Sequence, residues 1–120
     1  MSYSDSFKDH LANPRNVGEL SNATGLAEET NPVCGDRLRL SVLTSQGRII
    51  KAKYLAYGCP PTLVCGSVLT ELILGMSVHD AKNVTRDDLI ERVGGLPSRK
   101  QHAAALAIET LRSALKRSAT

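Results

Sequence analysis

The chain has 120 residues, of which 42% are hydrophobic and 22% are charged, and these shares are near the globular average. They exclude a disordered or fibrous protein, and the length fits a single domain over residues 1–120. Only 3% of the residues are aromatic and the net charge is a mild +3, so we expect no nucleic-acid partner.

The sequence opens without the basic and apolar segments of a secretory leader, and it has no run of about 20 apolar residues. We therefore expect a cytoplasmic protein with no membrane partner. In a reducing compartment, three cysteines indicate metal-binding thiols, catalytic thiols or buried core residues rather than disulfides.

The periodicity of hydrophobic residues and the positions of turn-forming residues predict the elements of one α+β domain. In chain order these are a helix at 4–11, a weak strand at 17–20, a loop at 21–34, strands at 37–42 and 48–57, and helices at 61–74, 78–83, 86–93 and 98–116. The strand at 37–42 alternates polar and apolar residues, and the turn at 45–47 makes an antiparallel hairpin with the next strand. Strands followed by helices favour an antiparallel sheet with helices packed on one face.

Two of the cysteines lie in glycine-containing loops at strand ends. Cys34 precedes the first strand of the predicted hairpin, and Cys59 follows the second. Because the start of one strand faces the end of the other, we expect both cysteines at the same end of the sheet, where ligands often bind. The alternative is that both are small buried hydrophobic residues.

Three further residues bear on the chemistry. Cys65 falls inside the predicted helix at 61–74, on another face from Cys59, and is interpreted as a packing residue. Asp36 and His102 could join Cys34 and Cys59 as the four ligands of a tetrahedral zinc ion. The competing interpretation is a nucleophilic pair of Cys59 and His102.

Four segments appear in an order and at a spacing that belong to one known family. They are Asn13-Pro14-Arg15-Asn16-Val17-Gly18, Asn31-Pro32-Val33-Cys34-Gly35-Asp36, Ala56-Tyr57-Gly58-Cys59, and Leu96-Pro97-Ser98-Arg99-Lys100-Gln101-His102. On these segments the chain resembles the iron–sulfur cluster assembly scaffolds, which comprise the IscU-like proteins and the N-terminal domain of NifU.

The resemblance implies a three-stranded antiparallel sheet with helices packed on it, and a scaffold rather than an enzyme. It implies that the protein accepts sulfur from a cysteine desulfurase, takes up iron, holds a transient [2Fe–2S] cluster and transfers it to apo-proteins. By position, the ligands are Cys34, Cys59 and His102, with Asp36 near the metal, and zinc can take the same site in the isolated protein. We expect a monomer or a weak dimer.

The chain also departs from the family pattern. The family has a third cysteine after the histidine, where this chain has Ala103, and it has serine where this chain has Cys65. A zinc-binding or sulfur-accepting protein without cluster assembly is therefore the alternative function. Ser98 and Arg99 replace the proline and valine of the segment that dedicated chaperones bind in the best-known members, so we do not expect that chaperone as a partner.

Overall fold

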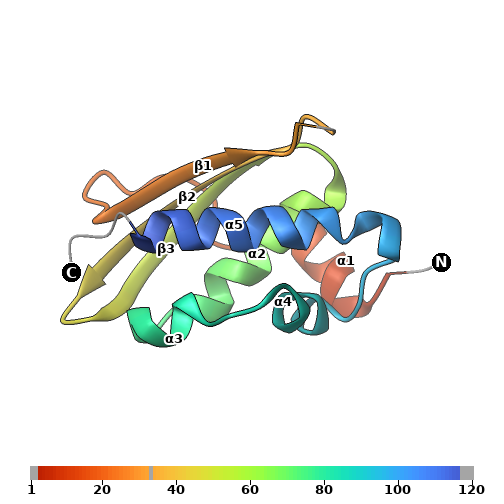
Figure 1. Ribbon diagram of the computed structural model, residues 1–120. Coiled ribbons are helices and arrows are strands. Elements are labelled where there is room, and N and C mark those ends of the chain that lie inside the picture. The colour runs from red at the N-terminus through yellow and green to blue at the C-terminus, as the bar shows by residue number, and fades with distance from the viewer. Residues whose placement is uncertain (1–2, 33, 117–120) are drawn as a thin grey trace.

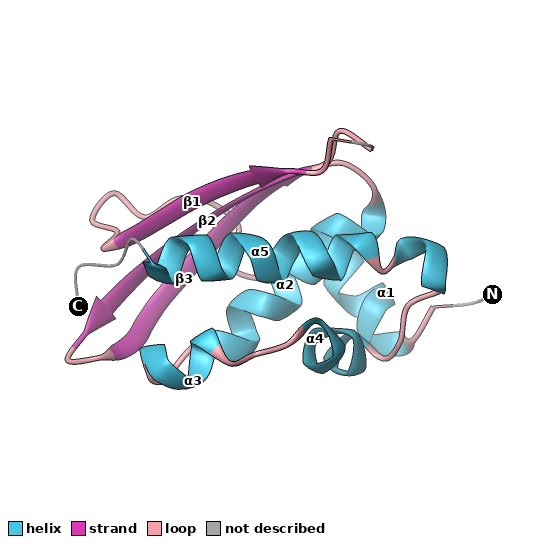
Figure 2. Cartoon of the chain, in the orientation of Figure 1, coloured by secondary structure: helices cyan, strands magenta, loops and turns pink. Residues whose placement is uncertain are grey.

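The structure is a computed structural model that describes residues 3–32 and 34–116. A three-stranded antiparallel sheet of order β1-β2-β3 forms one layer, and the helices cover one of its faces (Figures 1 and 2). This confirms the predicted α+β class. The elements are α1 (Asp5–Ala12), β1 (Gly25–Thr30), β2 (Arg37–Ser45), β3 (Arg48–Tyr57), α2 (Pro60–Ile73), α3 (Val78–Lys82), α4 (Arg86–Val93), the 3₁₀ helix η1 (Ser98–Lys100) and α5 (His102–Lys116).

Strands β2 and β3 form the predicted hairpin around a turn at Gln46 and Gly47. Both turn residues have positive φ, 52° and 78°, which suits a tight hairpin turn. The register places Arg37 opposite Tyr57. The start of β2 therefore lies beside the end of β3, and the loops that hold Asp36 and Cys59 meet at one end of the sheet.

The first strand corrects the sequence prediction. The segment at 17–20 is not a strand: Val17 makes only an isolated bridge to Tyr54 and is 51% exposed. The strand β1 lies instead within the predicted loop, and it pairs with β2. The residues of β1 show no clear strand pattern because the strand buries little apolar surface. Gly25 in this strand lies so close to the backbone of Ala114 that a Cβ would collide with it, so α5 packs directly on β1.

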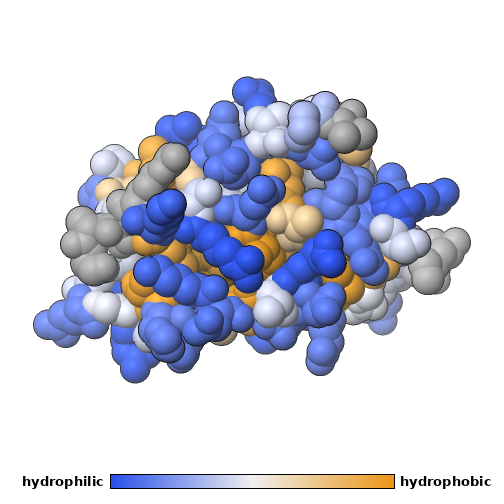
Figure 3. Space-filling view, viewed as in Figure 1, coloured by the Kyte–Doolittle hydropathy of each residue, from blue (hydrophilic) through white to orange (hydrophobic). Residues whose placement is uncertain are grey.

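The core lies between the sheet and helices α2 and α5, and aliphatic side chains build most of it. Helix α2 is buried over almost its whole surface because it lies between the sheet and other helices. Its Gly66 sits against the ring of Tyr54, where a Cβ would not fit. Polar side chains cover much of the helical face, with hydrophobic surface exposed between them (Figure 3).

The last predicted helix is divided in two. Residues Ser98–Lys100 form the 3₁₀ helix η1, and α5 begins at His102. Gln101 lies between them and donates its side-chain amide to the carbonyl oxygen of Leu96. This break places His102 at the N-terminal end of α5, at the same end of the molecule as the loops before β2 and after β3 (Figure 1).

Candidate metal centre

Cys59 lies at the junction of β3 and α2, where it is the N-cap residue of the helix. Its neighbour Gly58 has a φ of 148°, and a Cβ there would overlap the carboxylate of Asp36. Glycine is required at this position for two reasons, the backbone conformation and the close approach of Asp36. The two loops are thus in direct contact.

Asp36 is 4% exposed, and one of its carboxylate oxygens contacts three other side chains. Its Oδ2 accepts a hydrogen bond from the hydroxyl of Thr62 at 2.9 Å and one from the thiol of Cys59 at 3.4 Å. The Nε2 atom of His102 lies 3.4 Å from the same oxygen. Side chains from the start of α2 and the start of α5 therefore converge on a single carboxylate oxygen in the loop before β2.

These contacts determine the ionisation of Asp36. Burial opposes the charged form, but hydrogen bonds from Thr62 and from the side chain and backbone of Cys59, together with the positive charge that His102 has when its ring is protonated, outweigh it. They hold the pKa of the Asp36 carboxyl below its ordinary value. At neutral pH the group is a carboxylate, which is the form that binds metal ions.

His102 directs one ring nitrogen toward this group. Its Nδ1 lies 3.2 Å from the carbonyl oxygen of Arg99, which can only accept, so Nδ1 carries the proton. In the neutral ring Nε2 is then unprotonated. This atom is buried, faces Asp36 and has no hydrogen-bond partner among the described residues. A buried imidazole nitrogen whose ring is oriented by a carbonyl hydrogen bond at the other nitrogen is the arrangement found at metal-binding histidines.

The spacing of the three donor atoms fits a metal ion. One ligand atom each of Asp36, Cys59 and His102 lies within 4.8 Å of the other two. Tetrahedral zinc with ordinary bond lengths separates sulfur from oxygen by about 3.5 Å and nitrogen from oxygen by about 3.3 Å. Both separations are 3.4 Å here. Thiolate, imidazole and carboxylate are donors that zinc and iron accept.

Cys34 lies outside this group of three donors. It is exposed in the loop between β1 and β2, and its backbone N–H donates to the side-chain oxygen of Asn31 at 3.4 Å. It shares the end of the sheet with Cys59, as the hairpin predicts. Of the two cysteines, only Cys59 has its sulfur among the clustered donor atoms.

Cys65 is a packing residue, as interpreted from its helical position. It is fully buried, and burial, with a smaller contribution from Cys59, raises the pKa of its thiol to about 12. It therefore stays protonated at neutral pH. Ala103, which occupies the place of the third family cysteine, is also fully buried.

Thr62 is the residue at this site that the sequence analysis missed. It is 1% exposed in the first turn of α2, and besides its bond to Asp36 it lies 3.5 Å from the sulfur of Cys59. The available signal was a hydroxyl three residues after Cys59 in a segment that is otherwise apolar.

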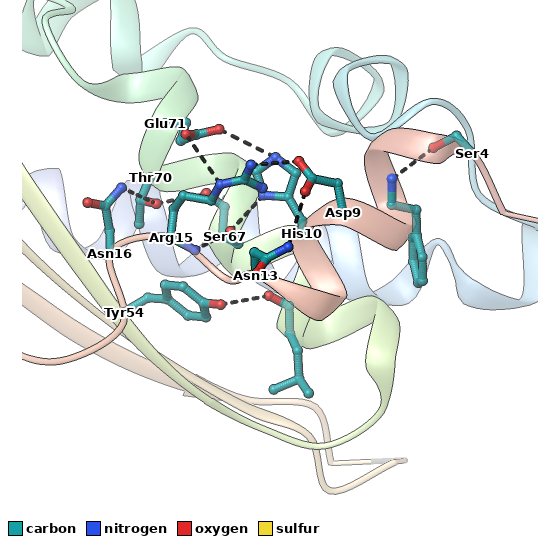
Figure 4. Close-up of polar contacts among 12 residues, drawn as sticks. Ser4, Asp9, His10, Asn13, Arg15, Asn16, Tyr54, Ser67, Thr70 and Glu71 are labelled. Atoms are coloured by element: carbon teal, nitrogen blue, oxygen red, sulfur yellow. Dashed lines mark hydrogen bonds and ion pairs between the residues drawn. The ribbon is translucent and has the colours of Figure 1, made fainter.

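The segment Asn13–Asn16 fixes α1 and the following loop to α2 (Figure 4). The backbone N–H of Arg15 donates to the hydroxyl of Ser67 at 2.9 Å, and Ser67 also lies 2.7 Å from Nδ1 of His10. The other ring nitrogen of His10 lies 3.4 Å from the carboxylate of Glu71. Burial, assisted by the charge of Arg15, lowers the pKa of His10, although Glu71 and Asp9 oppose the shift.

Comparison with known proteins shows the family of this chain. The family model described as the NifU-like N terminal domain matches residues 2–119, and the chain belongs to this family. The "Iron-sulfur cluster assembly scaffold protein IscU 1" of Archaeoglobus fulgidus is 39% identical over 113 residues, which are 94% of this chain and 74% of that protein. The IscU scaffold protein of Azotobacter vinelandii is 34% identical, and the match covers 97% of this chain and 93% of that protein.

Solved structures share the fold. The NifU-like N-terminal protein of Brucella abortus superposes with a TM-score of 0.77 at 11% identity, covering 95% of this chain and 92% of that one. A crystal structure from Fervidobacterium islandicum, described as a "Putative iron-sulfur cluster assembly scaffold protein for SUF system", gives 0.74 at 22% identity, covering 94% and 96%. Among the described residues, none of the helices is long and apolar enough to cross a bilayer.

Proposed function

We propose that this protein is an iron–sulfur cluster assembly scaffold or carrier, which binds iron and sulfide and transfers a [2Fe–2S] cluster. The observation that carries the proposal is the convergence of Asp36, Cys59 and the Nε2 atom of His102 in a member of the NifU-like family. Relatives named as cluster assembly scaffolds support the same role.

The site residues divide into two groups in this proposal. Asp36, Cys59 and His102 lie together before any cargo binds, and they would receive the first iron ion. Cys34 would join from its exposed loop and supply the second thiolate. Thiolates are the usual ligands of such clusters, and an imidazole can replace one of them.

The proposed partners are a cysteine desulfurase, which would supply sulfur, and apo-proteins, which would receive the cluster. The protein acts as a scaffold and not as an enzyme, because the cluster is its cargo. Relatives named for nitrogen fixation and cluster assembly support a place in such a pathway.

A second function is favoured by Cys34 and Ala103. Three clustered donors together with one exposed thiol suit a single zinc ion, or a persulfide carried on a cysteine, without cluster assembly. In the sulfur-accepting form, exposure favours Cys34 over Cys59 as the thiol that attacks a donor persulfide.

The test is anaerobic reconstitution with ferrous iron and sulfide, followed by measurement of iron, zinc, acid-labile sulfide and visible absorption. We expect equal iron and sulfide and a coloured protein, which Cys34→Ala, Cys59→Ala and His102→Ala lose and the control Cys65→Ala retains. A colourless protein without iron contradicts the proposal. Zinc alone, at about one ion per chain, supports the second function instead.

A further inference from the structure

The hydroxyl of Thr62 contacts two side chains of the candidate site. The residue is 1% exposed, and its Oγ1 lies between the two loops of the candidate site. It donates to Oδ2 of Asp36 at 2.9 Å and lies 3.5 Å from the sulfur of Cys59. A buried polar group is costly unless it is satisfied, and here the carboxylate satisfies it.

The orientation of the Asp36 carboxylate depends more strongly on the Thr62 hydroxyl once a metal ion binds. In the metal-free protein its Oδ2 accepts from both the Thr62 hydroxyl and the Cys59 thiol. A cysteine binds metal as the thiolate, so its proton leaves and with it the hydrogen bond to Asp36. The thiol no longer holds the carboxylate, and the hydroxyl of Thr62, 2.9 Å from the same oxygen in this structure, can still do so.

We propose that Thr62 is a positioning residue, whose hydroxyl holds the Asp36 carboxylate toward Cys59 and His102 and so sets the metal affinity of the site. This inference rests on the proposed function, because it assumes that the three side chains bind metal. Thr62 does not coordinate the ion itself. It orients a ligand in the way that hydrogen-bonding partners outside a metal's own ligands commonly do.

The test uses cobalt(II) as a probe, because its absorption spectrum reports both thiolate ligation and coordination geometry. Metal-free wild type, Thr62→Val, Thr62→Ala and Thr62→Ser are titrated with cobalt(II) without oxygen. We expect the valine and alanine variants to bind about 10-fold or more weakly, with altered ligand-field bands, and the serine variant to stay near wild type. Valine keeps the shape of threonine and removes only the hydrogen-bonding group.

The matched control is Thr110→Val. Thr110 is also fully buried, and its hydroxyl donates to the carbonyl oxygen of Leu106 within α5. This variant loses a buried hydroxyl without touching the site, so its cobalt affinity and spectrum should equal those of wild type. The melting temperature of each metal-free variant shows whether it is folded.

The outcomes separate the inference from the proposed function. If wild type gives no cobalt–thiolate absorption, the metal site and this inference both fail. If wild type binds but Thr62→Val and Thr62→Ala bind equally well with the same spectrum, only the role of Thr62 is overturned. If neither variant folds while Thr110→Val does, Thr62 is a structural residue and the inference is also overturned.

Discussion

The carboxylate of Asp36 and the imidazole of His102 face each other at 3.4 Å, although they lie far apart in the sequence. Neither residue depends on the other for its orientation. Thr62 and Cys59 hold the aspartate, and the carbonyl of Arg99 holds the histidine. Two groups that are oriented independently form a preorganised pair, which would lower the cost of ordering them if an ion binds there.

The acid sensitivity of the fold should depend on Asp36. Its folded-state pKa lies below the ordinary value of 3.8, so the ionised carboxylate stabilises the fold at neutral pH. That contribution is lost as the pH falls through 3.8 toward the folded-state value. In urea unfolding of the metal-free proteins, the free energy of unfolding of wild type should therefore fall relative to that of Asp36→Asn below about pH 4. A constant difference between the two proteins across this range contradicts the assignment.

A second pH dependence should come from His10. Burial lowers its pKa from 6.5, so the neutral ring is favoured in the folded chain and protonation favours unfolding. The stabilising effect is complete above about pH 6.5 and is lost as the pH falls through the folded-state pKa. Replacement by glutamine should flatten the loss of stability in this range. The control is His79→Gln, which removes an exposed histidine outside this contact.

The three thiols should differ in reactivity. Cys34 is exposed, Cys59 is half-buried and Cys65 is fully buried with a pKa of about 12. Mass spectrometry after timed alkylation of the metal-free protein should find Cys34 modified first and Cys65 modified only after unfolding. Cys65→Ser should lower the free energy of unfolding by about 1–3 kcal/mol, since it buries an unsatisfied hydroxyl, and should leave metal binding intact. Rapid labelling of Cys65 in the folded chain would contradict this order.

Gly58 should be far less tolerant of alanine than another glycine of positive φ. At Gly58 a Cβ overlaps the Asp36 carboxylate, whereas at Gly75, with a φ of 86°, nothing lies within 4 Å. Both substitutions incur backbone strain of order 1–3 kcal/mol. Only Gly58→Ala should also displace Asp36 and weaken zinc binding, measured by competition with a chromogenic chelator. Equal zinc affinity in the two variants would show that the contact has no bearing on the site.

The hairpin was predictable from sequence because β2 alternates polar and apolar residues along its length. The strand β1 was not predictable, because its two adjacent glutamates, Glu28 and Glu29, interrupt the alternation of polar and apolar residues. Its position is set instead by pairing with β2 and by packing of α5. The segment at 17–20 suggested a strand by its composition, but it contacts the sheet only through the isolated bridge between Val17 and Tyr54.

The candidate site was predictable to the extent that it depends on the hairpin. The hairpin brings the loops of Asp36 and Cys59 together, and the alternation of polar and apolar residues predicts the hairpin. The approach of His102 depends on how α5 crosses the sheet, which the spacing of residues does not encode. The part played by Thr62 depends on a side-chain contact between α2 and the loop before β2, and a contact of this kind follows only from the packed structure.

The three donors come from the loop before β2, the start of α2 and the start of α5, so they are neighbours only when the whole chain is folded. An ion that binds all three together binds the folded chain in preference to the unfolded chain. Its binding free energy is then thermodynamically linked to the unfolding equilibrium, and loading the site suppresses unfolding of the entire molecule. The same linkage acts in reverse, because any partner that opens the contact between α5 and the sheet also weakens the hold on the ion.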